Sequence, residues 1–132
     1  MRLRLNILIF AAIAALLPSQ HASATELGNN ALKDLTVDRT WSGSRLLTGY
    51  QASVWKWKAD GTVCVRLGSQ NSGCADDGTW KIVDRQICYQ FTWWLKSINI
   101  MSACFSVEDR GKGDYEAMMP SGSRLLAFRV LP

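Results

Sequence analysis

The chain has 132 residues, and its 15 Lys and Arg against 11 Asp and Glu give a formal net charge of +4. This length predicts one domain. Charges of both signs are interspersed along the chain, so the small positive excess argues against a nucleic-acid-binding protein.

The first 24 residues have the features of a secretory signal peptide. Arg2 and Arg4 give a basic start, residues 7–17 form an apolar run, and residues 22–24 (Ala-Ser-Ala) offer a cleavage site. The apolar run is too short to span a membrane. We expect cleavage after residue 24, which leaves 108 of the 132 residues as a single β domain, 25–132, in the periplasm or outside the cell. With Arg2 and Arg4 removed, 13 basic residues face 11 acidic ones, a net charge of +2. We expect no transmembrane segment after cleavage.

A short helix is predicted at the start of this domain. Ala31, Leu32 and Leu35 share one helical face, and Asn30 is the expected N-cap. A helix of this length is not stable alone, so it must pack on the rest of the domain.

From residue 40 onward the pattern is that of β-strands. Short runs of alternating apolar and polar residues are separated by turn signals such as Asp60-Gly61 and Asp84-Arg85. About seven or eight strands that follow one another through tight turns favour an antiparallel meander. Since so many strands in so short a chain twist and tend to close, we predict an all-β fold, a small up-and-down barrel or strongly coiled meander.

The predicted inward row is rich in aromatic side chains. Lysines of the same strands, such as Lys56 and Lys58, alternate with them and are predicted to face outward. The inward aromatic residues are Trp41, Trp55, Trp57, Trp80, Tyr89, Phe91, Trp93, Phe105 and Phe128.

An even number of cysteines in a small exported chain predicts disulfides, with free buried thiols as the alternative. A turn near Lys96 would place Cys88 and Cys104 opposite each other on consecutive strands, where a bridge can close. Cys64 would then pair with Cys74. We favour this pairing; the other two pairings of four cysteines stay open.

The composition also excludes several chemistries. The only histidine, His21, lies in the signal peptide, so the domain has no Ser-His-Asp triad and no histidine-ligated zinc. It has no Cys-x-x-Cys pair and no Gly-rich phosphate loop, and we predict no cofactor or metal. Most acidic residues fall in turns or on outward faces, so a carboxylate-based hydrolase acting on cell-envelope sugars is only the alternative to a non-enzymatic protein. These acids are Asp60, Asp76, Asp77, Glu108, Asp109, Asp114 and Glu116.

One apolar cluster stands at a predicted turn, in residues 93–101. Alternation cannot bury both Trp93 and Trp94, so one of them should face away from the core. We expect Trp94 to be an exposed anchor for a partner, because tryptophan is enriched among binding hot spots; the alternative is that a loop or the N-terminal segment covers it. The candidate binding residues are Trp93, Trp94, Leu95, Ile98 and Ile100.

Several short motifs resemble a family of small exported proteobacterial proteins of unknown function. They are Asp60-Gly61-Thr62, Gly78-Thr79-Trp80, Ile87-Cys88-Tyr89, Cys104, Tyr115 and residues 126–130, and the resemblance covers about residues 35–132. It implies a periplasmic or secreted domain with a calycin-like or lipocalin-like sheet. Cys88 and Cys104 match the family's cysteine pair, Cys64 and Cys74 look like an addition, and the family supplies no activity.

From these features we expect an exported, non-enzymatic β-barrel protein. It would bind a small apolar ligand between its aromatic rows or a protein partner at the Trp94 turn.

Overall fold

The computed structural model describes residues 24–45, 47, 49, 51–68 and 70–132. The predicted signal peptide, apart from Ala24, lies outside these residues. In the part described, no helix has the length and apolar character needed to cross a membrane. The elements are β1 (Thr25–Glu26), α1 (Asn29–Thr36), β2 (Arg39–Arg45), β3 (Gln51–Trp57), β4 (Thr62–Leu67), β5 (Asp76–Val83), β6 (Gln86–Phe91), the 3₁₀ helix η1 (Lys96–Ile98), β7 (Ser102–Gly111), β8 (Asp114–Met118) and β9 (Arg124–Val130).

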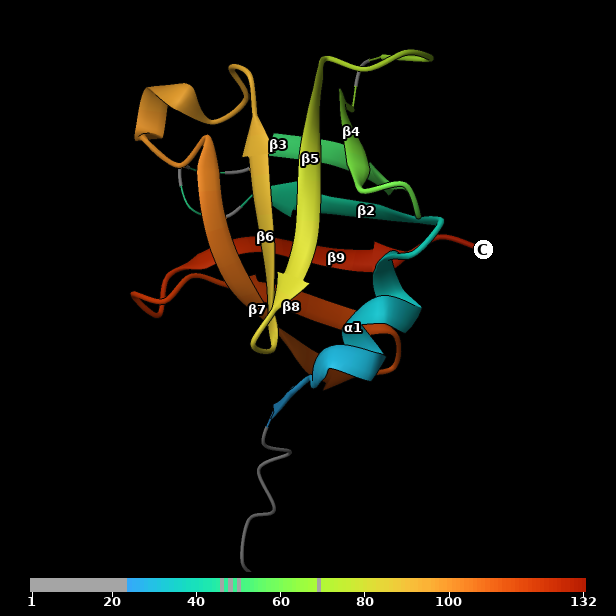
Figure 1. Ribbon diagram of the computed structural model, residues 1–132, viewed down its shortest axis with the longest axis vertical. Helices are drawn as coiled ribbons and strands as arrows, with labels where there is room; N and C mark the ends of the chain where they lie inside the picture. Colours follow the sequence, from blue (N-terminus) through green and yellow to red (C-terminus); the bar gives the residue numbers. More distant parts are fainter. Residues whose placement is uncertain (1–23, 46, 48, 50, 69) are drawn as a thin grey trace, which may run out of the picture.

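Strands β2 to β9 form a closed antiparallel barrel of eight strands (Figure 1). Each strand pairs with the next in sequence, and β9 returns to pair with β2. The prediction of a small all-β up-and-down barrel is therefore confirmed. Strand β1 lies outside the barrel and extends the sheet along β7, with Thr25 opposite Asp109.

The seam between β2 and β9 closes the barrel, and Gly43 allows it. A Cβ at Gly43 would collide with the carbonyl oxygen of Ala127 and with Phe128. Glycine lets the two backbones approach this closely. Two residues earlier, the Trp41 ring stacks on Phe128 with centroids 3.8 Å apart, so the two strands that close the barrel also meet inside it.

Aromatic rings fill the barrel interior. Trp57, at the centre, has ring neighbours at 4.7 Å (Trp41), 5.6 Å (Trp55) and 6.4 Å (Phe105). Interiors packed in this way leave few voids larger than a water molecule. The predicted inward row is right for eight of its nine members, and seven of these are buried: Trp41, Trp55, Trp57, Tyr89, Phe91, Phe105 and Phe128.

Trp80 also faces inward but is only partly buried: its ring packs on Trp57 with centroids 5.7 Å apart, and its Nε1 donates to the Lys58 carbonyl oxygen at 3.0 Å. One member of the predicted inward row is wrong. Trp93 is 49% exposed, because the strand alternation ends at Phe91 and the chain turns before Trp93.

Helix α1 packs against β2, β5 and β6 (Figure 1). Leu32 is fully buried, and Trp41 Nε1 donates to the Leu35 carbonyl oxygen at 2.6 Å. The helix is as predicted, but the expected Asn30 cap is wrong. The N-cap is Gly28, whose carbonyl accepts from Leu32 at 3.0 Å, so Asn30 already lies inside the helix.

Both disulfides have the pairing favoured from sequence, Cys64–Cys74 and Cys88–Cys104. Cys88 and Cys104 are direct partners on β6 and β7, with Cα atoms 4.0 Å apart. No free cysteine remains among the described residues. Two disulfides fit an oxidising, extracytoplasmic environment.

The hydrogen bond from Trp41 to the helix can be tested by comparing Trp41→Phe with Trp57→Phe. Both tryptophans are fully buried, but among the described residues Trp57 Nε1 has no hydrogen-bond partner. Trp41→Phe should cost about 0.5–1.5 kcal/mol more than Trp57→Phe, because it removes the hydrogen bond to the partly buried Leu35 carbonyl oxygen. Urea unfolding measures this, and hydrogen exchange should accelerate in α1 only for Trp41→Phe. Equal costs with α1 equally protected would contradict the assignment.

The disulfides give a second prediction. The unreduced protein, unfolded in denaturant, should show no reactive thiol. The double change Cys88→Ala and Cys104→Ala should lower the free energy of unfolding by about 3 kcal/mol, because it frees a loop of 16 residues in the unfolded chain. Chemical denaturation measures this cost, and any thiol titrated before reduction would overturn the pairing.

Candidate functional site

The connection between β6 and β7 sends its two tryptophans in opposite directions. After Phe91 the chain leaves the sheet and tightens into η1, with Lys96 N bonded to the Trp93 carbonyl oxygen at 3.0 Å. Leu95 has a positive φ of 66°, which breaks the strand geometry. Trp94 is therefore only 4% exposed, while Trp93 is 49% exposed.

The structure corrects the predicted binding cluster. Trp94, expected to be an exposed anchor, belongs to the buried core together with Leu95. Ile98 and Ile100 are half-buried and pack against that core. Of the five candidate residues, Trp93 alone offers a large exposed apolar side chain, because the strand ends at Phe91 and its alternation does not reach the two tryptophans.

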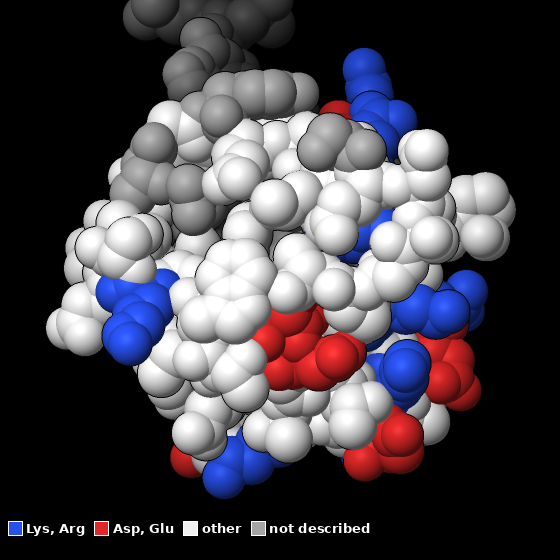
Figure 2. Space-filling view, turned by 90° about the horizontal axis from the view of Figure 1, so that it is seen from above, with Lys and Arg blue, Asp and Glu red and all other residues white. Residues whose placement is uncertain are grey.

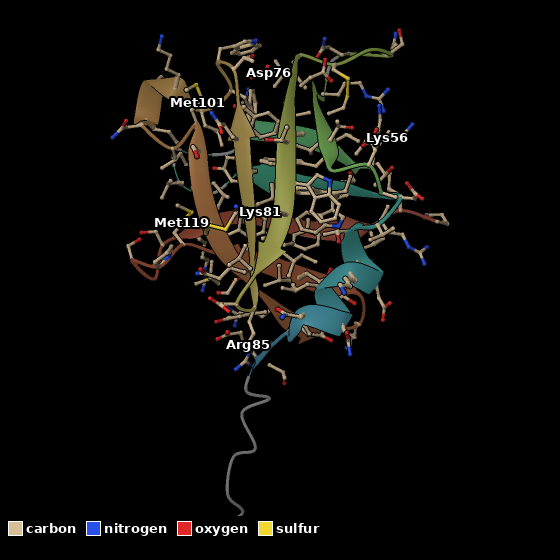
Figure 3. The ribbon with its side chains drawn as sticks, in the orientation of Figure 1. Lys56, Asp76, Lys81, Arg85, Met101 and Met119 are labelled. Carbon is tan, nitrogen blue, oxygen red and sulfur yellow. A yellow bond between two sulfur atoms is a disulfide. The ribbon has the colours of Figure 1, made fainter. Side chains whose placement is uncertain are left out.

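A buried carboxylate holds this turn. Asp76, the first residue of β5, is 5% exposed and lies at the same end of the barrel (Figure 3). It accepts hydrogen bonds from the backbone amides of Thr92 (3.1 Å), Trp93 (2.8 Å) and Trp94 (2.7 Å), and from the Thr92 hydroxyl. We expected Asp76 in a solvated turn, but in the structure its buried carboxylate holds the Trp93 turn.

The hydrogen bonds decide the charge state of Asp76. Burial works to raise its pKa, but the Thr92 hydroxyl and the amides of Trp93 and Trp94 favour the ionised form and outweigh it. The pKa of Asp76 therefore lies below its ordinary value. An ionised carboxylate can accept all four bonds, since it carries no proton of its own.

Tyr89 holds the far side of the same connection. Its hydroxyl donates to the Ile100 carbonyl oxygen at 2.7 Å. Burial raises the pKa of Tyr89 well above its usual value, so it stays protonated and able to donate. The segment between residues 92 and 100 is thus fixed at both ends by side chains of the barrel, which makes Trp93 an anchor on a rigid support.

Trp93 borders an open hollow of about 740 Å³ at this end of the barrel. Apolar surface from Trp93, Trp94 and Leu95 dominates its lining, with Gln51, Lys96 and Ser97 at the margin. The same end is mostly uncharged, with acidic side chains near its middle and basic ones toward the edges (Figure 2). An exposed tryptophan in weakly charged surroundings is typical of the centre of a protein interface.

The acidic residues were the candidates for the enzymatic alternative. Asp114 and Glu116 share a shallow hollow on the outer wall. Asp114 pairs with Arg129 at 2.6 Å, and Glu116 pairs with Arg110 at 2.7 Å. Each of these two carboxylates therefore accepts a hydrogen bond from an arginine on the surface of the barrel.

One group of possible metal ligands occurs in the described residues, Cys64, Cys74 and Asp77. Both sulfurs are already joined in a disulfide, so neither is a thiolate ligand. The group therefore does not form a metal centre.

The fold and the anchored turn define a small, disulfide-bonded, closed antiparallel barrel with an exposed aromatic residue at one end. No protein-family model, curated protein or solved structure matches this chain.

Asp76 gives a prediction with a matched control one residue away. Asp76→Asn should lower the free energy of unfolding by about 2–4 kcal/mol at neutral pH, because an amide cannot replace the charged acceptor of several hydrogen bonds. Asp77→Asn, at an exposed position, should change it by less than about 0.5 kcal/mol.

The pH dependence follows from the lowered pKa. The stabilisation from Asp76 is fully present above the ordinary aspartate pKa of 3.8 and is lost as the pH falls through the lower folded value. Urea unfolding between pH 2 and 7 should therefore show a smaller acid loss in Asp76→Asn than in the wild type. Matching acid profiles for Asp76→Asn and Asp77→Asn would contradict the anchor role.

Proposed function

We propose that this is an exported, non-enzymatic binding protein of the periplasm or the extracellular space, which binds a partner protein through Trp93. The observation that carries the proposal is the exposed Trp93 ring on a turn fixed by buried Asp76. A rigid aromatic anchor loses little conformational entropy on binding, and such residues dominate interface energies.

A protein partner is favoured over a small apolar ligand because of the packed interior. The rows that were expected to hold such a ligand contact each other directly: Trp55 lies 5.4 Å from Phe91 and 5.9 Å from Tyr89, centroid to centroid. A ligand between them would have to displace rings that support the barrel. The open hollow beside Trp93 needs no such displacement.

Export is supported by two independent features. Residues 1–24 have the pattern of a signal peptide, and both disulfides need an oxidising compartment to form and persist. The resemblance to small exported proteobacterial proteins also supports export, and we propose that the chain belongs to that family.

Photo-crosslinking tests the proposal. A photoreactive residue at exposed Ser97, beside Trp93, should form an adduct with a discrete protein in extracytoplasmic extract. The same residue at exposed Val83, next to the β5–β6 turn, should not form it. Adding Trp93→Ser should abolish the Ser97 adduct while changing the free energy of unfolding by less than about 0.5 kcal/mol, as is usual for surface substitutions.

The Val83→Ser variant is the control for Trp93→Ser, because it removes another exposed apolar side chain. It should leave the Ser97 adduct intact. An adduct that survives Trp93→Ser, or one that contains only lipid, would overturn the protein-binding proposal.

A further inference from the structure

A second, separate surface lies on the outer wall of the barrel. A groove of about 270 Å³ runs over the outward side chains of β2, β3 and β4. Val54 and the Cys64–Cys74 disulfide give it apolar surface, and Thr40 adds a hydroxyl. It shares no lining residue with the hollow beside Trp93, so it does not depend on the proposed function.

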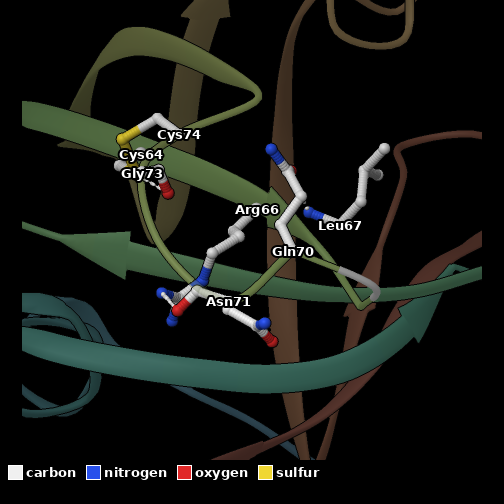
Figure 4. Close-up of a disulfide and its surroundings, with 7 residues drawn as sticks. All are labelled: Cys64, Arg66, Leu67, Gln70, Asn71, Gly73 and Cys74. Atoms are coloured by element: carbon white, nitrogen blue, oxygen red, sulfur yellow. Dashed lines mark hydrogen bonds between the residues drawn. A yellow bond between two sulfur atoms is a disulfide. The ribbon is translucent and has the colours of Figure 1, made fainter.

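The disulfide builds one wall of this groove. Antiparallel barrels are convex outside, but here Cys74 ties the β4–β5 connection back onto β4 (Figure 4). Arg66 donates to the Asn71 carbonyl oxygen at 3.3 Å, and Leu67 N donates to the Gln70 side chain at 2.9 Å. The connection is therefore a fixed wall beside the strands.

Three basic side chains, Lys56, Lys58 and Arg66, line the groove. Asp77 stands at its disulfide wall, with a carboxylate oxygen within 4.8 Å of the Cys64 and Cys74 sulfurs. Among the described residues none of the three basic side chains makes a salt bridge, whereas Arg110 on β7 and Arg124 and Arg129 on β9 are paired with carboxylates. With a net charge of only +2 on the predicted mature chain, three cations in one groove are a local excess that complements an anion.

We propose that this groove binds an oxyanion, the phosphate or carboxylate group of a small ligand. The Arg66 guanidinium presents the planar donor pair that matches either group, and the two lysines add point charges. The apolar floor at Val54 and the disulfide would contact the ligand's carbon skeleton. The volume of about 270 Å³ lies just below the usual range of ligand pockets, which starts at about 300 Å³, so the ligand is small, of about monosaccharide size.

The test uses inorganic phosphate and glucuronate as probes, titrated separately at low ionic strength to limit charge screening. Two-dimensional amide NMR of the oxidised protein should show saturable shifts on β3 and β4. The double change Lys56→Gln and Arg66→Gln should weaken binding about tenfold or more, because it removes two of the three cationic hydrogen-bond donors. Lys81→Gln is the matched control, an exposed lysine on the outer wall of β5 outside this groove (Figure 3).

The two probes identify the source of the oxyanion. Tighter binding of phosphate assigns a phosphorylated ligand, and tighter binding of glucuronate assigns an acidic sugar. No saturable shift with either probe, or an equal loss in Lys81→Gln, would overturn the proposal.

A second variant tests the groove itself. The double change Cys64→Ser and Cys74→Ser keeps every charge but releases the β4–β5 connection from β4. It should therefore weaken binding several-fold. Unchanged affinity in this variant would show that surface charge alone attracts the anion, and would overturn the groove as a site.

Discussion

The structure depends on filling a small closed barrel with aromatic rings, and Trp41 is where these contacts meet. Its ring stacks on Phe128 across the closing seam, lies 4.7 Å from Trp57 and 6.2 Å from Phe105, and its N–H holds the end of helix α1 at Leu35. Strand closure, core packing and helix attachment therefore share one side chain. Because contacts within such a cluster are coupled, their energies are not additive.

Because side chains fill the barrel interior, a ligand or partner would have to bind on the outer surface. Barrels that hold small ligands keep a cavity within the strands, whereas this one is packed like the core of any compact domain. What distinguishes the protein then lies on its connections. The turn after β6 presents Trp93, and the connection after β4 folds back to make a charged groove. In each case a rigid barrel positions a short irregular segment, which is the usual arrangement for binding sites.

Much of the fold could be predicted because successive residues of a strand face opposite sides of the sheet, so a sheet with one buried face produces alternating apolar and polar residues. It indicated the strands and the Cys88–Cys104 pair, since opposed positions on consecutive strands follow from the turn between them, and Cys64–Cys74 was then the remaining pair. It failed where the chain leaves the sheet. Trp93 and Trp94 exchanged roles because β6 ends at Phe91 and the chain bends before Trp93, so the alternation does not extend to either tryptophan. Asp76 was missed because its partners lie 16 to 18 residues away and are backbone amides, which no side-chain pattern reveals.

The cysteines pair in the order in which they occur along the chain, the first with the second and the third with the fourth. A chain that is oxidised while it is still being translocated, amino terminus first, would expose Cys74 soon after Cys64, before either later cysteine emerges. Each thiol would therefore meet its native partner before any competing one. A pairing in chain order is one that thiol oxidation during translocation can produce without later disulfide rearrangement.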